Sequence, residues 1–275
     1  MTLLRIDKEK CNKDGICSQE CPAAIIRLAQ EDDGFPDVAE GAEDFCLVCG
    51  HCVAVCPQGA LDHARVRLDA CPPVIRELAI SPDQAVQFLR SRRSIRNYKD
   101  KPVEKEIIEA LIRTARYAPT SGNSQLLHWT VFSQRDDLKK IAAMTVDFFR
   151  DLIARAPQGG YPPYLPILVT AWEMGFDAVT RNAPVLLVAS APIEDANGLV
   201  DVSISLSYLE LAAMAQGLGT CWAGLVQGAL SYWPPLKEFV ALPEGHEHHY
   251  PMMLGHPKFR YHRLPERKAP RIDWR

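Results

Sequence analysis

The sequence predicts an α+β protein with two domains, a small cysteine-rich one followed by a larger one of layered helices and strands. The chain has 275 residues, which is long enough for both domains. Seven of its nine cysteines lie between Cys11 and Cys56. Beyond them, long helical patterns are interspersed with a few short strand patterns. They show no regular βαβ rhythm, which is typical of a layered α+β domain.

The clustered cysteines form two runs with the same frame. The run Cys46–Pro57 has the pattern Cys-x2-Cys-x2-Cys-x3-Cys-Pro, and the run Cys11–Pro22 repeats it with Asp14 in place of the second cysteine. Thiolates hold the iron of iron–sulfur clusters, and cysteines spaced this closely place three sulfurs around one cluster. The candidate ligands are Cys11, Asp14, Cys17, Cys21, Cys46, Cys49, Cys52 and Cys56.

These runs resemble the bacterial two-cluster ferredoxin over roughly the first seventy residues. The resemblance implies that the last cysteine of each run binds the cluster of the other run. The implied sets are Cys46, Cys49, Cys52 and Cys21 for one [4Fe-4S] cluster, and Cys11, Cys17 and Cys56 for the other. Asp14 either ligates iron through oxygen or is a solvated loop residue, so the second cluster is [4Fe-4S] or [3Fe-4S].

Two other uses of cysteine fit less well. Structural zinc usually takes four ligands in two separated pairs, whereas each run here is a triplet with a trailing Cys-Pro. A disulfide framework needs a secreted context, and the chain begins without an apolar stretch of signal-peptide length. Thiols in this number instead predict a reducing, cytoplasmic location.

Composition excludes other classes of partner. The net charge of −3 gives no basic footprint for nucleic acid. No window approaches the apolar length that a membrane span requires, so no membrane association is expected.

The domain boundary is predicted near residue 80. Cys71 to Pro73 interrupts regular structure, and Ser81 to Gln84 forms a capping-box pattern with proline at the first helical position. A helix is therefore expected to start near residue 82. The expected domains are 1–70 and 82–275, joined by a linker at 71–81.

The second domain contains four further predicted elements. Val103–Arg116 has the apolar spacing of an amphipathic helix, and Leu199–Leu218 is a mostly apolar helix buried on several sides. Trp129–Phe132 and Val185–Ala189 are short runs of β-branched or aromatic residues, so buried strands are expected.

Three guanidinium groups and a hydroxyl follow the first helix of this domain, contributed by Arg92, Arg93, Ser94 and Arg96. Guanidinium groups bind phosphate oxygens through paired hydrogen bonds, although an isolated basic run is more often a solvated surface. Here the run is accompanied by a polar loop, a glycine-rich segment and a basic segment near the C-terminus. These are Ala118–Gln125, Gly217–Gly224 and, after Leu254–Pro257, Pro265–Lys268.

In this order and spacing, the segments resemble the nitroreductase family of FMN-dependent oxidoreductases over residues 82–275. The resemblance implies an α/β/α domain with a mainly antiparallel sheet and a homodimer with the flavin at its interface. It implies that Arg92, Arg93, Ser94, Arg96 and Arg267 hold the FMN phosphate and ribityl chain, and that Ser121, Asn123 and Gln125 bind the polar edge of the ring. Trp222, Ala223 and Gly224 would approach the ring, with an N–H near Gly224 facing N5. The family's loop often continues Gln-Pro-Trp, whereas Leu126 and Leu127 follow Gln125 here.

The predicted function is electron transfer from a soluble donor such as ferredoxin, through the clusters, to FMN, which reduces a small organic substrate such as a nitroaromatic or a quinone. No side chain is predicted to be a catalytic acid, base or nucleophile. One alternative is an NAD(P)H-driven nitro- or quinone reductase whose clusters export electrons. The chain lacks the Gly-x-Gly-x-x-Gly motif of a dedicated nicotinamide-binding domain after a strand. The family resemblance nevertheless allows nicotinamide to bind over the flavin. Another is a non-enzymatic electron-transfer or redox-sensing flavoprotein.

Two further segments are not assigned a cofactor-binding role. Tyr161–Tyr164, within the segment 157–166, is interpreted as a surface loop or a lid. The histidines of 246–249 could bind metal, but no second set of ligands stands out, and a turn between Gly245 and Pro251 explains them.

Overall fold

The computed structural model describes residues 2–28, 34–156 and 160–275 and divides the chain into two compact units. The first unit comprises residues 1–80 with 122–124, and the second comprises 81–121 with 125–275. Residues 157–159, part of the segment interpreted as a loop or lid, lie outside the described residues. The rest of that segment leads into a helix, for which Tyr164 is the N-cap.

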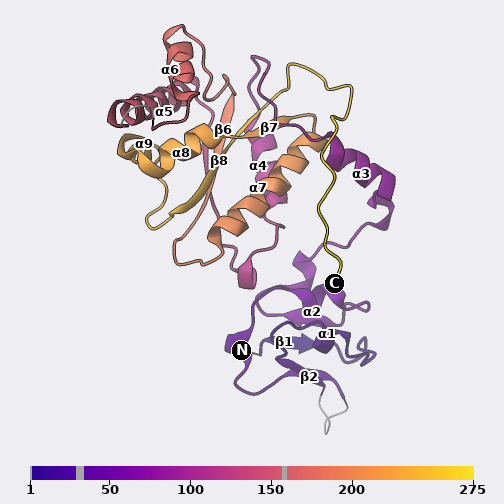
Figure 1. Ribbon diagram of the computed structural model, residues 1–275. Coiled ribbons are helices and arrows are strands. Elements are labelled where there is room, and N and C mark those ends of the chain that lie inside the picture. Colours follow the sequence, from indigo (N-terminus) through magenta and orange to yellow (C-terminus); the bar gives the residue numbers. More distant parts are fainter. Residues whose placement is uncertain (1, 29–33, 157–159) are drawn as a thin grey trace. The chain divides into compact units, whose positions relative to one another are not determined.

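The first unit is built from short elements, coloured indigo to purple in Figure 1. Strand β1 (Leu4–Ile6) pairs antiparallel with β4 (Leu61–His63), and β2 (Ile26–Leu28) pairs antiparallel with β3 (Pro36–Val38). The helices are α1 (Ile16–Gln19) and α2 (His51–Val55), and single 3₁₀ turns cover Glu43–Phe45, Leu68–Ala70 and Arg76–Leu78. The core of this unit is small. It contains Cys17, Cys52, Val53 and a few leucines and isoleucines.

The second unit starts with α3 (Pro82–Ser91), at the position the sequence predicted. Both hydrogen bonds of the capping box are present. The Gln84 N–H donates to Ser81 Oγ at 3.2 Å, and the Ser81 N–H donates to Gln84 Oε1 at 2.8 Å. These bonds satisfy two backbone donors that the first turn of a helix leaves free, so the predicted helix start is confirmed.

A four-stranded antiparallel sheet forms the middle layer of the second unit. Its order is β5 (His128–Phe132), β6 (Val185–Ala191), β8 (His248–Gly255) and β7 (Gly219–Trp222). Helices α4 (Lys105–Ala115) and α7 (Gly198–Ala215) cover one face (Figure 1). The other face packs against α5 (Arg135–Arg155), α6 (Leu165–Glu173), α8 (Gly224–Tyr232) and α9 (Pro234–Val240). The predicted α/β/α layering with an antiparallel sheet is confirmed.

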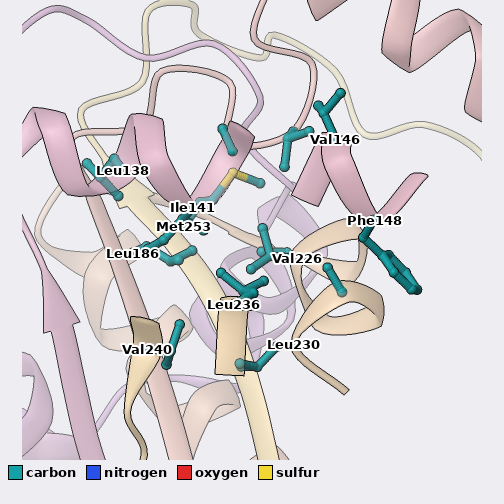
Figure 2. Close-up of a cluster of buried hydrophobic side chains, with 14 of the residues drawn as sticks. Leu138, Ile141, Val146, Phe148, Leu186, Val226, Leu230, Leu236, Val240 and Met253 are labelled. Atoms are coloured by element: carbon teal, nitrogen blue, oxygen red, sulfur yellow. The ribbon is translucent and has the colours of Figure 1, made fainter. Parts of the chain in front are cut away.

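Strand β6 shows why the sheet is a middle layer. All seven of its residues are buried, because the side chains alternate between two covered faces. Leu187 belongs to the core under α4 and α7. Leu186 lies in the opposite core with Ile141 of α5 and Met253 of β8, as Figure 2 shows. A strand with one solvated face would alternate polar and apolar residues.

The elements that the sequence predicted near α4, β5, β6 and α7 are confirmed with small shifts at their ends. The burial predicted for β5 is wrong, because it is an edge strand in which no residue is buried. Contrary to the sequence expectation, α7 is long and apolar enough to cross a membrane by length and composition alone. However, 44% of that stretch is buried, with Leu206 and Leu209 fully enclosed and the charged Asp201 and Glu210 also buried. Its packing is that of a core helix.

The turn expected between Gly245 and Pro251 is shorter than predicted. The Glu247 N–H donates to the Gly245 carbonyl at 3.0 Å, but β8 already begins at His248 and continues through Pro251. Proline has no N–H, and in an antiparallel strand the N–H and C=O of one residue point to the same neighbour. The Pro251 carbonyl accepts from the Ala223 N–H at 3.0 Å, on the side where β7 has ended at Trp222. The missing donor therefore costs the pairing with β6 nothing.

Candidate functional site

The two cysteine runs fold into the same backbone shape. Gly15 and Gly50 precede α1 and α2 with left-handed backbones, φ/ψ of 71°/6° and 71°/4°. Two residues before each glycine, Lys13 and Val48 are left-handed as well, with φ of 59° and 54°. Glycine suits this position because it lacks a Cβ. Asp14 therefore takes the backbone place of a cysteine in the second run.

Two cavities in the first unit separate the candidate ligands into two sets. The first is lined by Cys21 together with Cys46, Cys49 and Cys52. The second is lined by Cys56 together with Cys11, Asp14 and Cys17. In each cavity, the last cysteine of one run meets the first three ligand positions of the other run. Spacing alone could not establish this exchange.

Backbone N–H groups donate to the sulfurs on both sides. The Val48 N–H lies 3.4 Å from Cys46 Sγ, and the Ala60 N–H lies 3.3 Å from Cys56 Sγ. Such bonds favour the thiolate form of a ligand. Burial acts the other way, raising the pKa of the Cys52 thiol to about 11 and also raising that of Cys17. Iron coordination would supply the stabilisation that these buried thiolates need.

The chemistry of the two donor sets fits iron–sulfur clusters. Four thiols line the first cavity, and three thiols and a carboxylate line the second. Thiolates are the usual ligands of cluster iron, and a cluster places a separate iron under each of them.

Asp14 lines the second cysteine cavity, and one of its carboxylate oxygens accepts a backbone hydrogen bond. Asp14 Oδ1 accepts from the Ile16 N–H at 3.1 Å, which forms a local Asx turn just before α1, whose N-cap is Gly15. One carboxylate oxygen is therefore used by the backbone.

His63 is a residue that sequence reasoning missed. It is 3% exposed, and its Nε2 lies 3.4 Å from Cys46 Sγ. Its other ring nitrogen, Nδ1, accepts from the N–H groups of Arg65 and Val66 at 3.0 and 3.1 Å. Burial is the main cause that lowers the pKa of His63, with the charge of Arg65 second. No sequence motif signals this residue, because it follows the cysteine runs on β4.

In the second unit, two of the four arginines predicted to hold the FMN phosphate and ribityl chain border a large cavity. Its volume is about 580 Å³, which lies within the usual range of small-molecule sites. Arg92 and Arg93 line it, and the Nε of Arg93 is buried with no hydrogen-bond partner. The other cations on its wall are Lys99, Lys258 and Arg260. An orphaned donor among cations fits an anionic ligand.

The C-terminal cations of this cavity differ from the one expected. Arg267 is exposed and does not line it, whereas Lys258 and Arg260 do. Both follow β8 directly, and an isolated bridge between Tyr98 and Pro257 fixes the start of this segment. The sequence shows that the C-terminal segment is basic, but it does not show which of its cations reach the cavity.

Ser94 and Arg96 do not line this cavity, and both influence Cys221 of β7. The Ile95 N–H donates to the Thr220 carbonyl at 2.8 Å, which holds the segment along the edge of β7. Burial raises the pKa of the Cys221 thiol, and Arg96 is the largest opposing influence, aided by a hydrogen bond with Ser94. The structure thus brings Arg92 and Arg93 together at the cavity and groups Ser94 with Arg96.

Glu210 of α7 connects the arginine segment to the end of β7. Its side chain is 8% exposed and accepts from Arg92 Nη1 at 3.1 Å, Thr220 Oγ1 at 2.9 Å and Trp222 Nε1 at 3.4 Å. Trp222 in turn packs edge-on against Tyr250, with ring centroids 5.0 Å apart. A buried carboxylate with three donors orients Arg92 and Trp222, two residues predicted to contact the ligand.

Ala223 and Gly224 form the junction between β7 and α8. The Ala223 N–H is used by Pro251, whereas Gly224 is the first residue of α8. A Cβ on Gly224 would lie 3.4 Å from the Tyr250 hydroxyl, which is an ordinary contact, so the Tyr250 side chain borders this turn without filling it.

The polar loop at 118–125 is held by α7. Both carboxylate oxygens of the buried Asp201 accept from the Ser121 N–H, at 3.2 and 3.1 Å, and Asn197 Nδ2 donates to Ser121 Oγ at 2.9 Å. Asp201 and Asn197 were not predicted from the sequence. The Gln125 N–H donates to Thr120 Oγ1 at 3.1 Å.

The tip of this loop has a left-handed backbone at Asn123 and Gln125, with φ of 57° and 50°. Residues 122–124 group with the first unit. There, Asn123 Nδ2 donates to the carbonyl oxygens of Leu47 and Val48 at 3.0 and 3.1 Å. In the structure, the Asn123 amide therefore binds backbone carbonyls beside a cysteine run.

Comparison with known proteins agrees with this arrangement. The chain is 27% identical over 197 residues to an FMN reductase [NAD(P)H] of Bacillus subtilis, covering 66% of this chain and 70% of that one. Over 46 residues it is 41% identical to a component of an ion-translocating oxidoreductase complex of Methanosarcina acetivorans, covering 17% of this chain and 15% of that one. A crystal structure of a nitroreductase with bound FMN from Bacteroides fragilis matches with a TM-score of 0.56 at 18% identity, covering 68% of this chain and 95% of that one, and shares the fold.

Family profiles locate these similarities along the sequence. Residues 10–61, which contain both cysteine runs, match the 4Fe-4S dicluster domain. Residues 89–256, from the arginine segment to the end of the sheet, match the Nitroreductase family. The chain therefore belongs to the nitroreductase family, as an oxidoreductase that carries a 4Fe-4S dicluster domain at its N-terminal end.

Proposed function

We propose that this protein takes electrons from a soluble carrier such as ferredoxin and delivers them to a small organic substrate such as a nitroaromatic or a quinone. Residues 1–70 bind two iron–sulfur clusters, residues 71–81 are a linker, and residues 82–275 bind FMN. The observation that carries the proposal is that one chain combines two cysteine-lined cavities in its first unit with a cation-lined cavity in its second. Bound clusters would conduct single electrons, and bound FMN would exchange single electrons or hydride with a substrate.

The cluster assignment follows the two cavities. Cys21, Cys46, Cys49 and Cys52 hold a [4Fe-4S] cluster, supported by their common cavity. Cys11, Cys17 and Cys56 hold the second cluster, of the [4Fe-4S] or [3Fe-4S] type. The type depends on Asp14, whose second carboxylate oxygen is the atom that could reach iron.

For FMN, we propose that Arg92 and Arg93 bind the phosphate with Ser94 and Arg96, joined by Arg267 as the family resemblance implies. Lys258 and Arg260 are supported as further contacts by their place on the cavity wall. Ser121, Asn123 and Gln125 are assigned to the polar edge of the ring, and Trp222, Ala223 and Gly224 to its N5 side. In this proposal the side chains bind and orient the cofactor, and none is a catalytic acid or base. The arginines also favour an anionic, reduced flavin.

We propose that the protein is a cytoplasmic homodimer. Helix α7 supports the dimer, because it is apolar on most sides and exposes Leu199, Val200 and Tyr208 at 48%, 54% and 41%. Exposed apolar side chains on a helix that is apolar on most sides support an interface with a second copy. Sedimentation velocity tests this: the wild type should sediment as a dimer, and Val200→Asp should shift it toward monomer. A monomeric wild type would refute the dimer.

Anaerobic stopped-flow tests the direction of electron flow. Reduced ferredoxin and NADPH are mixed separately with the reconstituted protein while flavin absorbance is recorded. The proposal expects fast bleaching by ferredoxin, and loss of that bleaching in Cys49→Ser, while dithionite still bleaches the variant. Fast bleaching by NADPH with none by ferredoxin would overturn it.

A second candidate function has support of its own. The similarity to an FMN reductase [NAD(P)H] favours a reductase driven by NAD(P)H, whose clusters would export electrons to another protein. In that case NADPH bleaches the flavin first, and an oxidised ferredoxin then becomes reduced. The same stopped-flow experiment separates the two functions.

A further inference from the structure

At one equivalent position of the two runs, only the second run is followed by a side chain that can donate a hydrogen bond to a ligand sulfur. Each run is followed by a strand at the same offset, β2 after the first and β4 after the second. His63 on β4 lies within 3.4 Å of Cys46 Sγ and is 3% exposed. The corresponding residue on β2 is Leu28, which is 39% exposed and cannot donate a hydrogen bond. The two runs therefore share a backbone shape but differ in the side chain at this position.

The tautomer of His63 follows from its neighbours. Two backbone N–H groups, of Arg65 and Val66, point at Nδ1 from 3.0 and 3.1 Å. A nitrogen that accepts two N–H groups carries no proton of its own, so the proton of the neutral ring is on Nε2. Nε2 is the atom that faces Cys46 Sγ. The imidazole therefore donates an N–H···S bond.

We infer that His63 is a positioning residue that raises the reduction potential of the cluster bound by Cys21, Cys46, Cys49 and Cys52. Reduction adds negative charge to the cluster and its sulfur ligands, so a fixed donor stabilises the reduced form more than the oxidised form. Cys46 then has two donors, the buried imidazole and the Val48 N–H. This inference rests on the proposed presence of the clusters.

The variant His63→Asn removes only the relevant donor. An asparagine Oδ1 can take over from Nδ1 as acceptor for Arg65 and Val66, but its side chain is too short to reach Cys46. His63→Gln places an amide N–H near the position of Nε2 and so can restore the bond. His51→Asn is the matched control, because His51 lines the same cavity but is exposed.

The experiment is an EPR-monitored redox titration of the reconstituted full-length protein. At a fixed potential near the midpoint, we expect His63→Asn to lower the ratio of reduced to oxidised cluster about tenfold, equal to 59 mV for one electron. His63→Gln should stay near the wild type, and His51→Asn should not move. No shift in His63→Asn, or equal shifts in the Asn and Gln variants, would overturn the inference, since equal shifts indicate altered packing.

A second measurement covers loss of the cluster in the Asn variant. Pulsed EPR of the reduced His51→Asn protein, labelled with ¹⁵N-histidine, should show coupling to a histidine nitrogen that His63→Gln abolishes. Absence of that coupling would overturn the inference. Failure of this inference can be told from failure of the proposed function. Protein without iron and labile sulfide would refute the clusters themselves. Protein that contains the clusters but lacks this coupling would refute only the role of His63.

Discussion

Glu210 offers a quantitative test of how the arginine segment is held. Replacing it with alanine removes the acceptor shared by Arg92, Thr220 and Trp222. A charge-assisted bond contributes about 1.5–3 kcal/mol, and the lower value applies because the Arg92 side chain is 31% exposed. The Thr220 bond contributes about 1 kcal/mol and the long Trp222 bond about half of that. We therefore expect Glu210→Ala to lower the free energy of unfolding by about 3 kcal/mol.

Urea unfolding followed by tryptophan fluorescence measures this value in the relevant unit, because every tryptophan of the chain lies at residue 129 or beyond. Glu210→Gln is the matched variant. It keeps an oxygen acceptor for the Thr220 hydroxyl and should lose about half as much as alanine.

A double-mutant cycle isolates the ion pair itself. Arg92→Ala combined with Glu210→Ala should be less destabilised than the sum of the single variants by about 1.5 kcal/mol, since the pair is already lost in either one. Additive losses, or a loss below about 1 kcal/mol in Glu210→Ala, would refute the reasoning that this buried carboxylate orders the segment.

Three further predictions follow from single contacts. Asp201→Ala should lower the free energy of unfolding in urea by about 2 kcal/mol, because the Ser121 N–H loses its acceptor. Asp201→Asn keeps one oxygen acceptor and should lower it less, so equal losses in the two variants would contradict this explanation. Asp14→Cys should keep all its iron after mild oxidation by ferricyanide, whereas the wild type should lose iron from the second cluster, as iron analysis will show; equal retention would refute a labile corner. Burial lowers the pKa of His249, so the unfolded chain binds more protons just below the usual value near 6.5, and unfolding free energy should fall as pH drops from about 7.5 to 5.5. His249→Gln should flatten that slope in urea titrations at each pH, and an unchanged slope would assign the dependence to other groups.

Features that depend on residues close together in the chain could be predicted from the sequence. The spacing of Cys46, Cys49 and Cys52 places three thiols around one site, and Gly50, which lies between the second and third of them, provides the left-handed turn before α2. The capping box at Ser81 fixed the start of α3 in the same way, through bonds that span three residues. Apolar periodicity located α4, α7 and the strand β6, because burial on known faces imposes a repeat on the sequence.

Tertiary structure alone decided which distant residues meet. Arg92 and Glu210 are 118 positions apart, and nothing in the local pattern of a mostly apolar helix indicates that its buried glutamate faces an arginine. The choice of Lys258 and Arg260 over Arg267 at the cavity, and the contact between His63 and Cys46, likewise depend on strand pairing and register. Local patterns encode periodicity and turns, whereas a buried polar group finds its partner only when packing removes both from water.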